Sequence, residues 1–339
     1  MSRTQIEIIG SGVAGLCCAR LFADHDCEVS IYSASAGPDD SCCSWWAGGM
    51  LAPSCEMESA DPLIGTLGEE SITFWKKYTS CVHSSGSLVL ASPRDIPDLK
   101  LFASKTSGSI FTESSKLAQL EPDLAERFQQ ALFFENECHI DPRLALQELS
   151  SSLAEQPNVS IHYSETLSDE SLCESTRANW RIDCRGLAAS NELTDLRGVK
   201  GEMLLLHLPE LTLNRPVRLL HPRYPLYIVP RENHVFMIGA TMIESNDRLS
   251  ITARSIMELL SAAYALHPAF AEASIIEIGC DARPAFSDNN PRLRRRGNTL
   301  YVNGLFRHGF LCGPAMARRA VDLALYSRID NKVTDENTD

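Results

Sequence analysis

Hydrophobic residues along this 339-residue chain recur with two periods, and the order of those periods predicts the fold class. Near the N-terminus, an apolar run at residues 6–9 predicts a short buried strand, and apolar residues spaced through 13–24 predict a helix. A second strand follows at residues 28–32. Strand, helix and strand in this order form a βαβ unit, which begins a parallel sheet covered by helices.

The middle of the chain has a different pattern, with short strands that are rich in β-branched and apolar residues. Their short spacings favour an antiparallel sheet. Later strands then return the chain to the first, parallel sheet. The predicted elements are strands at 86–91, 181–187, 202–206, 226–230, 235–239 and 299–303, and helices at 62–80, after the N-cap Asp141, at 253–264 and at 314–326.

The first strand runs directly into the pattern G-x-G-x-x-G, formed by Gly10, Gly12 and Gly15. The first glycine permits a tight turn, the second lets the backbone approach a pyrophosphate, and the third lets the helix pack closely on the strand. The helix then directs its N-terminal N–H groups and its dipole at the phosphates. This context predicts a dinucleotide site, against the alternative of an incidental glycine turn.

The acidic residue that usually binds the ribose hydroxyls is missing after the second strand. Ser33 occupies its place and is followed by Ala34 and Ser35. A serine hydroxyl brings no charge, so we expect ribose binding to be weaker there, or to be shared with Asp39 or Asp40. This position therefore does not distinguish FAD from NAD(P).

A second strand–glycine–helix junction lies near the other end of the chain. The strand predicted at 299–303 enters a loop containing Gly304, Gly309 and Gly313, and the helix predicted at 314–326 leaves it. We expect this helix to direct its N-terminus at the electron-rich edge of a bound ring. Two such junctions fit one long cofactor lying between them, although an ordinary buried turn gives the same pattern.

Charge and hydropathy exclude several classes of partner. The formal net charge of −13 and the pI near 5.2 argue against nucleic acid or an anionic membrane surface as the main partner. The one basic run, at 292–296, is interpreted as a solvated turn, and the polar tail after Arg328 as frayed. No apolar run approaches the length of a membrane span, and no signal peptide is evident, so we expect a cytoplasmic protein.

Twelve cysteines are present, but their spacing matches no metal-binding or redox motif. Two pairs are adjacent, at 17–18 and 42–43, and no C-x-x-C occurs. We therefore expect no metal site, and we interpret the cysteines as small buried apolar residues.

Three segments carry a resemblance to a known family. They are Ser-Trp-Trp-Ala-Gly-Gly-Met-Leu-Ala-Pro at 44–53 followed by Glu56, Gly-Ala-Thr-Met at 239–242, and Phe-Arg-His-Gly-Phe at 306–310. In this order, and over nearly the whole chain, they resemble the glycine oxidases of thiamine biosynthesis, which belong to the D-amino-acid oxidase family of FAD-dependent oxidoreductases. The resemblance implies an α/β fold with two domains. These are a Rossmann-like FAD-binding domain from residues 1–80, 138–200 and 281–339, and an inserted α+β substrate-binding domain, on a mostly antiparallel sheet, from 81–137 and 201–280.

The resemblance also implies the reaction and the residues that take part in it. Glycine and other small amines would be oxidised to the imine by non-covalently bound FAD, with O2 reduced to H2O2. A functional link to thiazole synthase is implied as well, through iminoglycine supplied for the thiazole of thiamine. The expected substrate contacts are Arg283, Tyr227, Arg307 and Met242. The expected FAD contacts are Gly10, Ser11, Gly12, Val13, Ala14, Gly15, Ser33, Cys42, Cys43, Ser44, Ala47, Gly48, Gly49, Met50, Arg307, His308, Gly309, Phe310 and Leu311.

The chemistry of an amino-acid substrate agrees with these residue types. A carboxylate is best held by a fixed, bidentate cation, for which Arg283 is the candidate, and Tyr227 can add a phenol donor. Hydride leaves the α-carbon for the flavin, so we expect no side chain to act as a strong acid or base, and we interpret His308 as structural. Asp281 could pair with Arg283 and weaken its hold on the substrate.

Two other functions fit the same residues. One is a D-amino-acid or sarcosine oxidase or dehydrogenase of the same fold. The more distant one is a dinucleotide-binding protein without oxidase activity. The oligomeric state, a homo-oligomer included, and the physiological electron acceptor are left open by the sequence.

Overall fold

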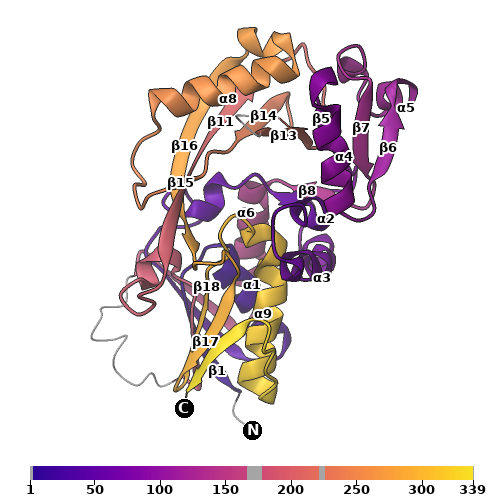
Figure 1. Cartoon of the computed structure of the whole chain (residues 1–339). Coiled ribbons are helices and arrows are strands. Elements are labelled where there is room, and N and C mark those ends of the chain that lie inside the picture. The colour runs from indigo at the N-terminus through magenta and orange to yellow at the C-terminus, as the bar shows by residue number, and fades with distance from the viewer. Residues whose placement is uncertain (1–2, 166–177, 221–225, 339) are drawn as a thin grey trace.

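The computed structural model describes residues 3–165, 178–220 and 226–338. The described residues form three sheets, and the two larger ones lie at opposite ends of the molecule, with both chain termini at the end that holds β1 and β17 (Figure 1). The expectation of an α/β fold with a parallel sheet and a mostly antiparallel sheet is confirmed.

The first large sheet has five parallel strands that begin with the N-terminal βαβ unit. β18, β10, β1, β2 and β9 run parallel, and β17 is added antiparallel to β18. In spatial order the strands are β19 (Thr334–Thr338), β17 (Arg292–Arg296), β18 (Thr299–Asn303), β10 (Trp180–Asp183), β1 (Gln5–Ile9), β2 (Glu28–Ser33) and β9 (Val159–Tyr163).

Helices from distant parts of the chain pack on one another beside this sheet. α1 and α9 are in contact along their lengths, and Leu16 and Phe22 of α1 are fully buried in the core that they share. The helices of this layer are α1 (Val13–Asp24), α2 (Pro53–Glu56), α3 (Pro62–Tyr78), α6 (Pro142–Ala154) and α9 (Gly309–Tyr326). Asp141 caps α6 as expected, because its carboxylate accepts from the N–H groups of Arg143 and Leu144.

The last helix begins at Gly309, five residues before the predicted start at Pro314. A proline inside a helix removes the N–H that would bond the carbonyl four residues earlier. Here that carbonyl belongs to Phe310, and it accepts a 2.7 Å hydrogen bond from the indole Nε1 of Trp75. A side chain 235 residues away therefore satisfies the group that Pro314 leaves unpaired.

The second large sheet is antiparallel except where β5 and β12 run parallel. Its strands are β15 (Ile243–Glu244), β16 (Ser274–Ala285), β11 (Arg197–His207), β14 (Val235–Gly239), β13 (Leu226–Pro230), β12 (Val217–Leu220), β5 (Ser87–Ala91), β7 (Gln130–Phe134) and β6 (Ile110–Glu113). The helices α4 (Ile96–Lys105), α5 (Ser114–Leu120) and α8 (Ala253–Leu266) accompany it, and β3 (Met50–Leu51), β8 (Cys138–Ile140) and β4 (Val82–His83) form the small third sheet. Short 3₁₀ turns occupy Cys43–Trp46, Pro93–Asp95, Pro122–Leu124, Gly186–Ala189 and Pro268–Glu272.

Two long strands connect the two ends of the molecule. β11 and β16 pair from Arg197 with Ala285 to His207 with Ser274, and both run through the domain boundaries expected at residues 200 and 280 (Figure 1). The predicted division into domains stays a prediction. Because of this long pairing, the last residues of β16 lie beside the parallel sheet.

The basic run at 292–296 is a strand, and its interpretation as a solvated turn was wrong. β17 pairs with β18 on one side and with β19, from the polar tail, on the other. Arg294 contacts Asp335 and Asp195 at 2.8 and 2.7 Å, and Arg296 contacts Glu336 at 2.7 Å. The acidic tail is therefore ordered rather than frayed, because its carboxylates pair with arginines of β17.

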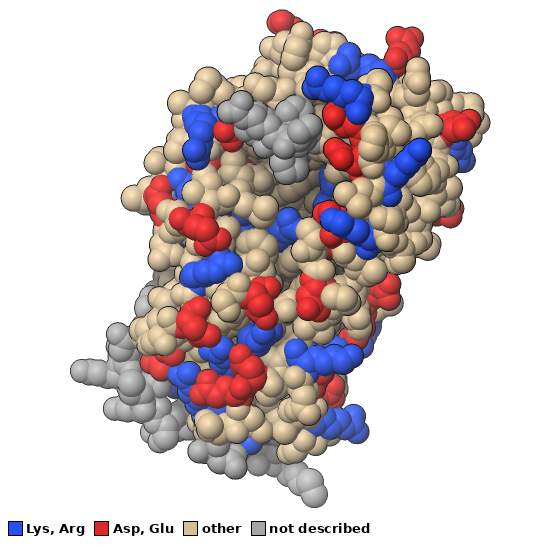
Figure 2. All heavy atoms as spheres, in the orientation of Figure 1, with Lys and Arg blue, Asp and Glu red and all other residues tan. Residues whose placement is uncertain are grey.

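Charge is mixed over the surface of the molecule. On the face drawn in Figure 2, Lys and Arg side chains are interspersed with Asp and Glu side chains. None of the described helices is long and apolar enough to cross a membrane. Among the described cysteines, eight are buried and Cys42, Cys43 and Cys280 are partly exposed, whereas Cys173 lies outside the described residues.

Candidate active site

A cavity of about 600 Å³ is lined by residues from both ends of the molecule, and almost all of the expected site residues line it. Gly15 is the exception and does not line the cavity. A Cβ at this position would lie 1.8 Å from the carbonyl oxygen of Gly10, so the glycine allows the helix to pack closely on the strand. The expected residues that line the cavity are Gly10, Ser11, Gly12, Val13, Ala14, Ser33, Cys42, Cys43, Ser44, Ala47, Gly48, Gly49, Met50, Tyr227, Met242, Arg283, Arg307, His308, Gly309, Phe310 and Leu311.

One end of the cavity is formed by the turn between β1 and α1. Gly10 has φ +101°, which favours glycine, and a Cβ there would meet the carbonyl oxygen of Cys184 at 2.7 Å. Gly12 is the N-cap of α1, and it has no side chain that could accept a capping hydrogen bond. The backbone N–H of Val13 donates to Ser44 Oγ at 3.1 Å. This bond ties the second glycine-rich segment to the start of α1.

The hydroxyl of Ser33 lies at the end of β2 and is engaged by two neighbouring serines. Its Oγ is 2.6 Å from that of Ser11 and 3.1 Å from that of Ser35, and the residue is buried. Asp39 accepts from the backbone N–H of Ser41 at 3.0 Å. Neither Asp39 nor Asp40 is among the residues that line the cavity.

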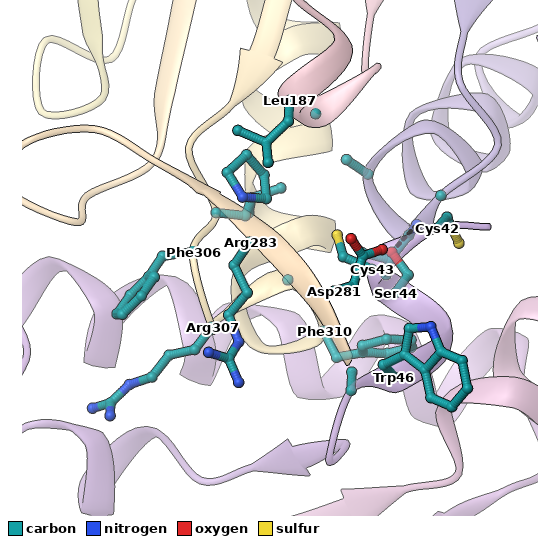
Figure 3. Close-up of a pocket in the computed structure, with 18 of the residues that line it drawn as sticks. Cys42, Cys43, Ser44, Trp46, Leu187, Asp281, Arg283, Phe306, Arg307 and Phe310 are labelled. Carbon is teal, nitrogen blue, oxygen red and sulfur yellow. Dashed lines mark hydrogen bonds between the residues drawn. The ribbon is translucent and has the colours of Figure 1, made fainter. Parts of the chain in front are cut away.

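The opposite end of the cavity contains the guanidinium of Arg283, which extends from the end of β16 (Figure 3). Its Nη1 donates to the carbonyl oxygen of Thr241 at 3.1 Å. A Cβ at Gly201 would lie 2.0 Å from Nη2, so a glycine is required beneath the guanidinium. Burial lowers the pKa of Arg283, and the nearby guanidinium of Arg307 lowers it further. Within the described part of the chain no carboxylate pairs with Arg283.

Asp281 does not pair with Arg283, contrary to the concern raised by the sequence. Its carboxylate faces Cys43 and Ser44 (Figure 3) and forms an ion pair with Arg248, in which Nη2 donates to Oδ2 at 3.0 Å. Alternation along β16 places Asp281 and Arg283 on the same face of the strand, so it is the ion pair with Arg248 that keeps the Asp281 carboxylate from pairing with Arg283. Arg283 is therefore left available to an anionic ligand.

Tyr227 of β13 contacts the backbone on two sides. A Cβ at Gly48 would lie 2.8 Å from its ring, and one at Gly239 would lie 3.0 Å away. Both glycines thus leave room for the phenol ring, which lines the cavity together with Arg283.

Arg307 lies in the loop before α9 and is ion-paired. Its Nη2 is 2.8 Å from Glu56 Oε2, while Nη2 of Arg218 is 2.6 Å from Glu56 Oε1. Nε2 of His308 also lies 2.9 Å from Oε2. Burial alone would raise the pKa of Glu56, but the guanidinium groups of Arg307 and Arg218 hold it well below its ordinary value.

His308 is a buried, neutral partner of this carboxylate. Burial lowers the pKa of His308, and this outweighs the opposing effect of Glu56. An ionised Glu56 requires Nε2 to carry the proton, so the imidazole donates to the carboxylate. This geometry supports the interpretation of His308 as structural.

The comparisons with known proteins agree with the geometry of the cavity. A family model described as FAD dependent oxidoreductase (DAO) matches residues 5–323. A putative thiamine biosynthesis oxidoreductase ThiO of Rhizobium etli is 48% identical over 314 residues, which cover 92% of this chain and 94% of that protein. The chain belongs to the D-amino-acid oxidase family. The expectation of this family is confirmed, and the protein is an FAD-dependent oxidoreductase.

Two further relatives of this D-amino-acid oxidase family member are informative. A bifunctional protein ThiO/ThiG of Nostoc sp. is 25% identical over 96% of this chain, which spans 53% of that protein's length. Among solved structures, glycine oxidase from Bacillus cereus has a TM-score of 0.80 at 20% identity, with 98% of this chain and 97% of that chain covered. This structural likeness shows a shared fold.

The cavity of this family member fits FAD in two respects. α1 and α9 both begin at its wall, and neither helix has a side-chain cap from its own N-cap residue or an acidic residue in its first turn. Helix N-termini without an acidic side chain suit a pyrophosphate and an electron-rich ring edge. Gly10 and Gly12 also keep the backbone open beside α1.

Several residues of the site were missed in the sequence. Arg218 is a charged residue inside the apolar strand β12, and that position was the available signal. Glu56 was noted only as part of a motif, although it links Arg218 to Arg307. Arg248 and Glu165 carry no local signal, since their neighbours in space come from other strands.

We expect Gly12→Val to yield mainly colourless protein. A Cβ there already lies 3.3 Å from Ser44 Oγ, and the methyl groups of valine would occupy the approach to the α1 N-terminus. The ratio of flavin to protein absorbance after purification measures the result. Gly37→Val is the matched control, because a Cβ at Gly37 meets no atom within 4 Å. A Gly12→Val protein with full flavin content would contradict the assignment.

Proposed function

We propose that this protein oxidises glycine and other small amines or amino acids to the imine. FAD, when bound, would supply the two-electron oxidation of the substrate, with O2 as the final acceptor reduced to H2O2. The single observation that carries the proposal is the partly buried guanidinium of Arg283, which has no carboxylate partner among the described residues of the cavity. The 48% identity to a protein named a thiamine biosynthesis oxidoreductase supports it.

Arg283 binds the carboxylate of the substrate in this proposal. A guanidinium offers parallel N–H donors that match the two carboxylate oxygens, and burial strengthens the contact. Tyr227 adds its phenol donor from the neighbouring wall. Arg307 and Met242 border the same space, with Arg307 held by Glu56.

The protein contributes positioning rather than acid–base catalysis. The α-hydrogen leaves as hydride, so a neutral amine requires no side-chain base. His308, which lines the cavity, donates its Nε2 proton to Glu56 and is buried. No described side chain at this end of the cavity is therefore assigned a proton-transfer role.

Substrate assays test the proposal directly. Purified protein is supplied with glycine, sarcosine and D-alanine in parallel, and H2O2 is measured together with O2 consumption. We expect peroxide from glycine. Activity confined to sarcosine or D-alanine would show that one of these, and not glycine, is the substrate. Flavin reduction without O2 consumption would show that the protein is a dehydrogenase.

We also propose that the imine product supplies the thiazole of thiamine. Curated relatives in which the matched region forms about half of a bifunctional ThiO/ThiG protein support a functional link to thiazole synthase. The test adds purified thiazole synthase to the glycine reaction and measures thiazole formation with and without this protein. Equal thiazole yield in both reactions would contradict the link.

FAD is expected to be bound without a covalent link. Burial raises the pKa of the Cys312 thiol, which lies 4.0 Å from the carbonyl oxygen of Ile64 and does not line the cavity. Burial also raises the pKa of Cys43, which does line the cavity, to about 12. Neither thiol is ionised at neutral pH. Acid precipitation should therefore release all flavin absorbance into the supernatant, and flavin retained in the pellet would contradict the prediction.

A further inference from the structure

The position that usually carries the ribose-binding acid holds Ser33, and its hydroxyl is already engaged. It shares hydrogen bonds with Ser11 and Ser35, and the residue is only 3% exposed. Asp39 and Asp40 do not line the cavity. The end of β2 therefore offers no carboxylate to the adenosine half of FAD.

A carboxylate reaches this place from the neighbouring strand. β9 runs parallel to β2, with Tyr163 in register with Ser33. Beyond β9, the N–H of Ser164 donates to the carbonyl of Ser35, and the N–H of Glu165 donates to that of Ser33, both at 2.9 Å. These two bonds fix the backbone of Glu165 beside the end of β2.

The side chain of Glu165 lines the same cavity as Gly10 and Gly12. It is 57% exposed, and its ion-pair contact among the described residues is His162 Nδ1 at 3.7 Å. A contact of this length leaves both carboxylate oxygens able to accept further hydrogen bonds. The two neighbouring hydroxyls of a ribose can both donate hydrogen bonds to one such carboxylate.

We propose that Glu165 is the acid that binds the adenosine ribose hydroxyls of FAD in this protein. The negative charge is supplied by the segment that follows β9, the strand next to β2, instead of by β2 itself. This inference rests on FAD dependence and is independent of the substrate and of the electron acceptor.

Binding of ADP and of 2′-deoxy-ADP to the apoprotein tests this proposal. Both are measured by calorimetry for the wild type, for Glu165→Gln and for Asp39→Asn, and FAD affinity is measured by quenching of flavin fluorescence. The amide keeps the size of the side chain and removes its charge. Glu165 is largely exposed, so the variant is expected to fold.

We expect Glu165→Gln to weaken FAD and ADP binding about tenfold or more, which is the loss of a charge-assisted hydrogen bond. The wild type should prefer ADP to 2′-deoxy-ADP, and the variant should lose most of that preference. Equal ADP affinity in wild type and Glu165→Gln would overturn the proposal, as would a loss of the preference in Asp39→Asn instead. Because ADP binding involves no amine and no O2, a protein that failed to oxidise glycine would still give a clear result.

Discussion

Replacing Arg283 with alanine is expected to lower kcat/KM for glycine about a hundredfold. The guanidinium is partly buried, and no carboxylate among the described residues pairs with it, so the carboxylate of a bound substrate would be its ion-pair partner. Losing a bidentate, charge-assisted contact inside a partly enclosed cavity costs about 3 kcal/mol. A loss of that size corresponds to roughly two powers of ten in rate.

The measurement is steady-state oxidation of glycine by flavin-saturated Arg283→Ala, together with inhibition by acetate and glycolate. Both inhibitors should bind much more weakly to the variant. Arg283→Lys keeps the charge but not the paired donors, so it should recover only part of the activity. Arg254→Ala, on the exposed face of α8, removes a guanidinium with little expected effect. Glycine oxidation within a few-fold of wild type would show that Arg283 is not the anchor.

Replacing Arg218 with methionine is expected to destabilise the protein by about 3 kcal/mol. Arg218 in β12 and Glu56 in α2 form a buried ion pair between the two ends of the molecule. Removing the cation leaves Glu56 with Arg307 and His308 alone, at a site where burial penalises the carboxylate. The loss of a partner to a buried charge costs much more than the loss of a surface pair.

Urea unfolding of wild type and variant, each with saturating FAD, measures this effect. The double variant Arg218→Met with Glu56→Gln removes the carboxylate together with one of its two cations and should recover part of the stability, so that the two changes are not additive. Arg254→Ala breaks the exposed contact with Glu258 and should cost less than about 1 kcal/mol. An Arg218→Met protein as stable as wild type would show that Glu56 needs no second cation.

Local chemistry explains why the dinucleotide turn could be predicted. Gly10 needs a positive φ, and a Cβ at Gly15 would collide with Gly10 five residues earlier, so both requirements are written within one short segment. The apolar spacing that predicts α1 is also local, and the structure places this helix at the predicted residues. The family could be recognised from short sequence motifs, which are local in the same sense.

Long-range partners explain what the sequence did not show. α9 starts at Gly309 because Trp75 satisfies the carbonyl that Pro314 leaves free. The arginines at 292–296 form a strand because the acidic tail pairs beside them. No local pattern contains either partner.

The sequence by itself determined the fold class, the dinucleotide turn and fewer than half of the residues that line the cavity, because these depend on short-range periodicity and on glycines at fixed spacing. Only the tertiary structure decided how the charged side chains are paired. It pairs Asp281 with Arg248, holds Arg307 on Glu56, and leaves Arg283 without a carboxylate among the described residues. Ion pairs join side chains from separate strands, and their partners are set by strand order and register rather than by distance along the chain.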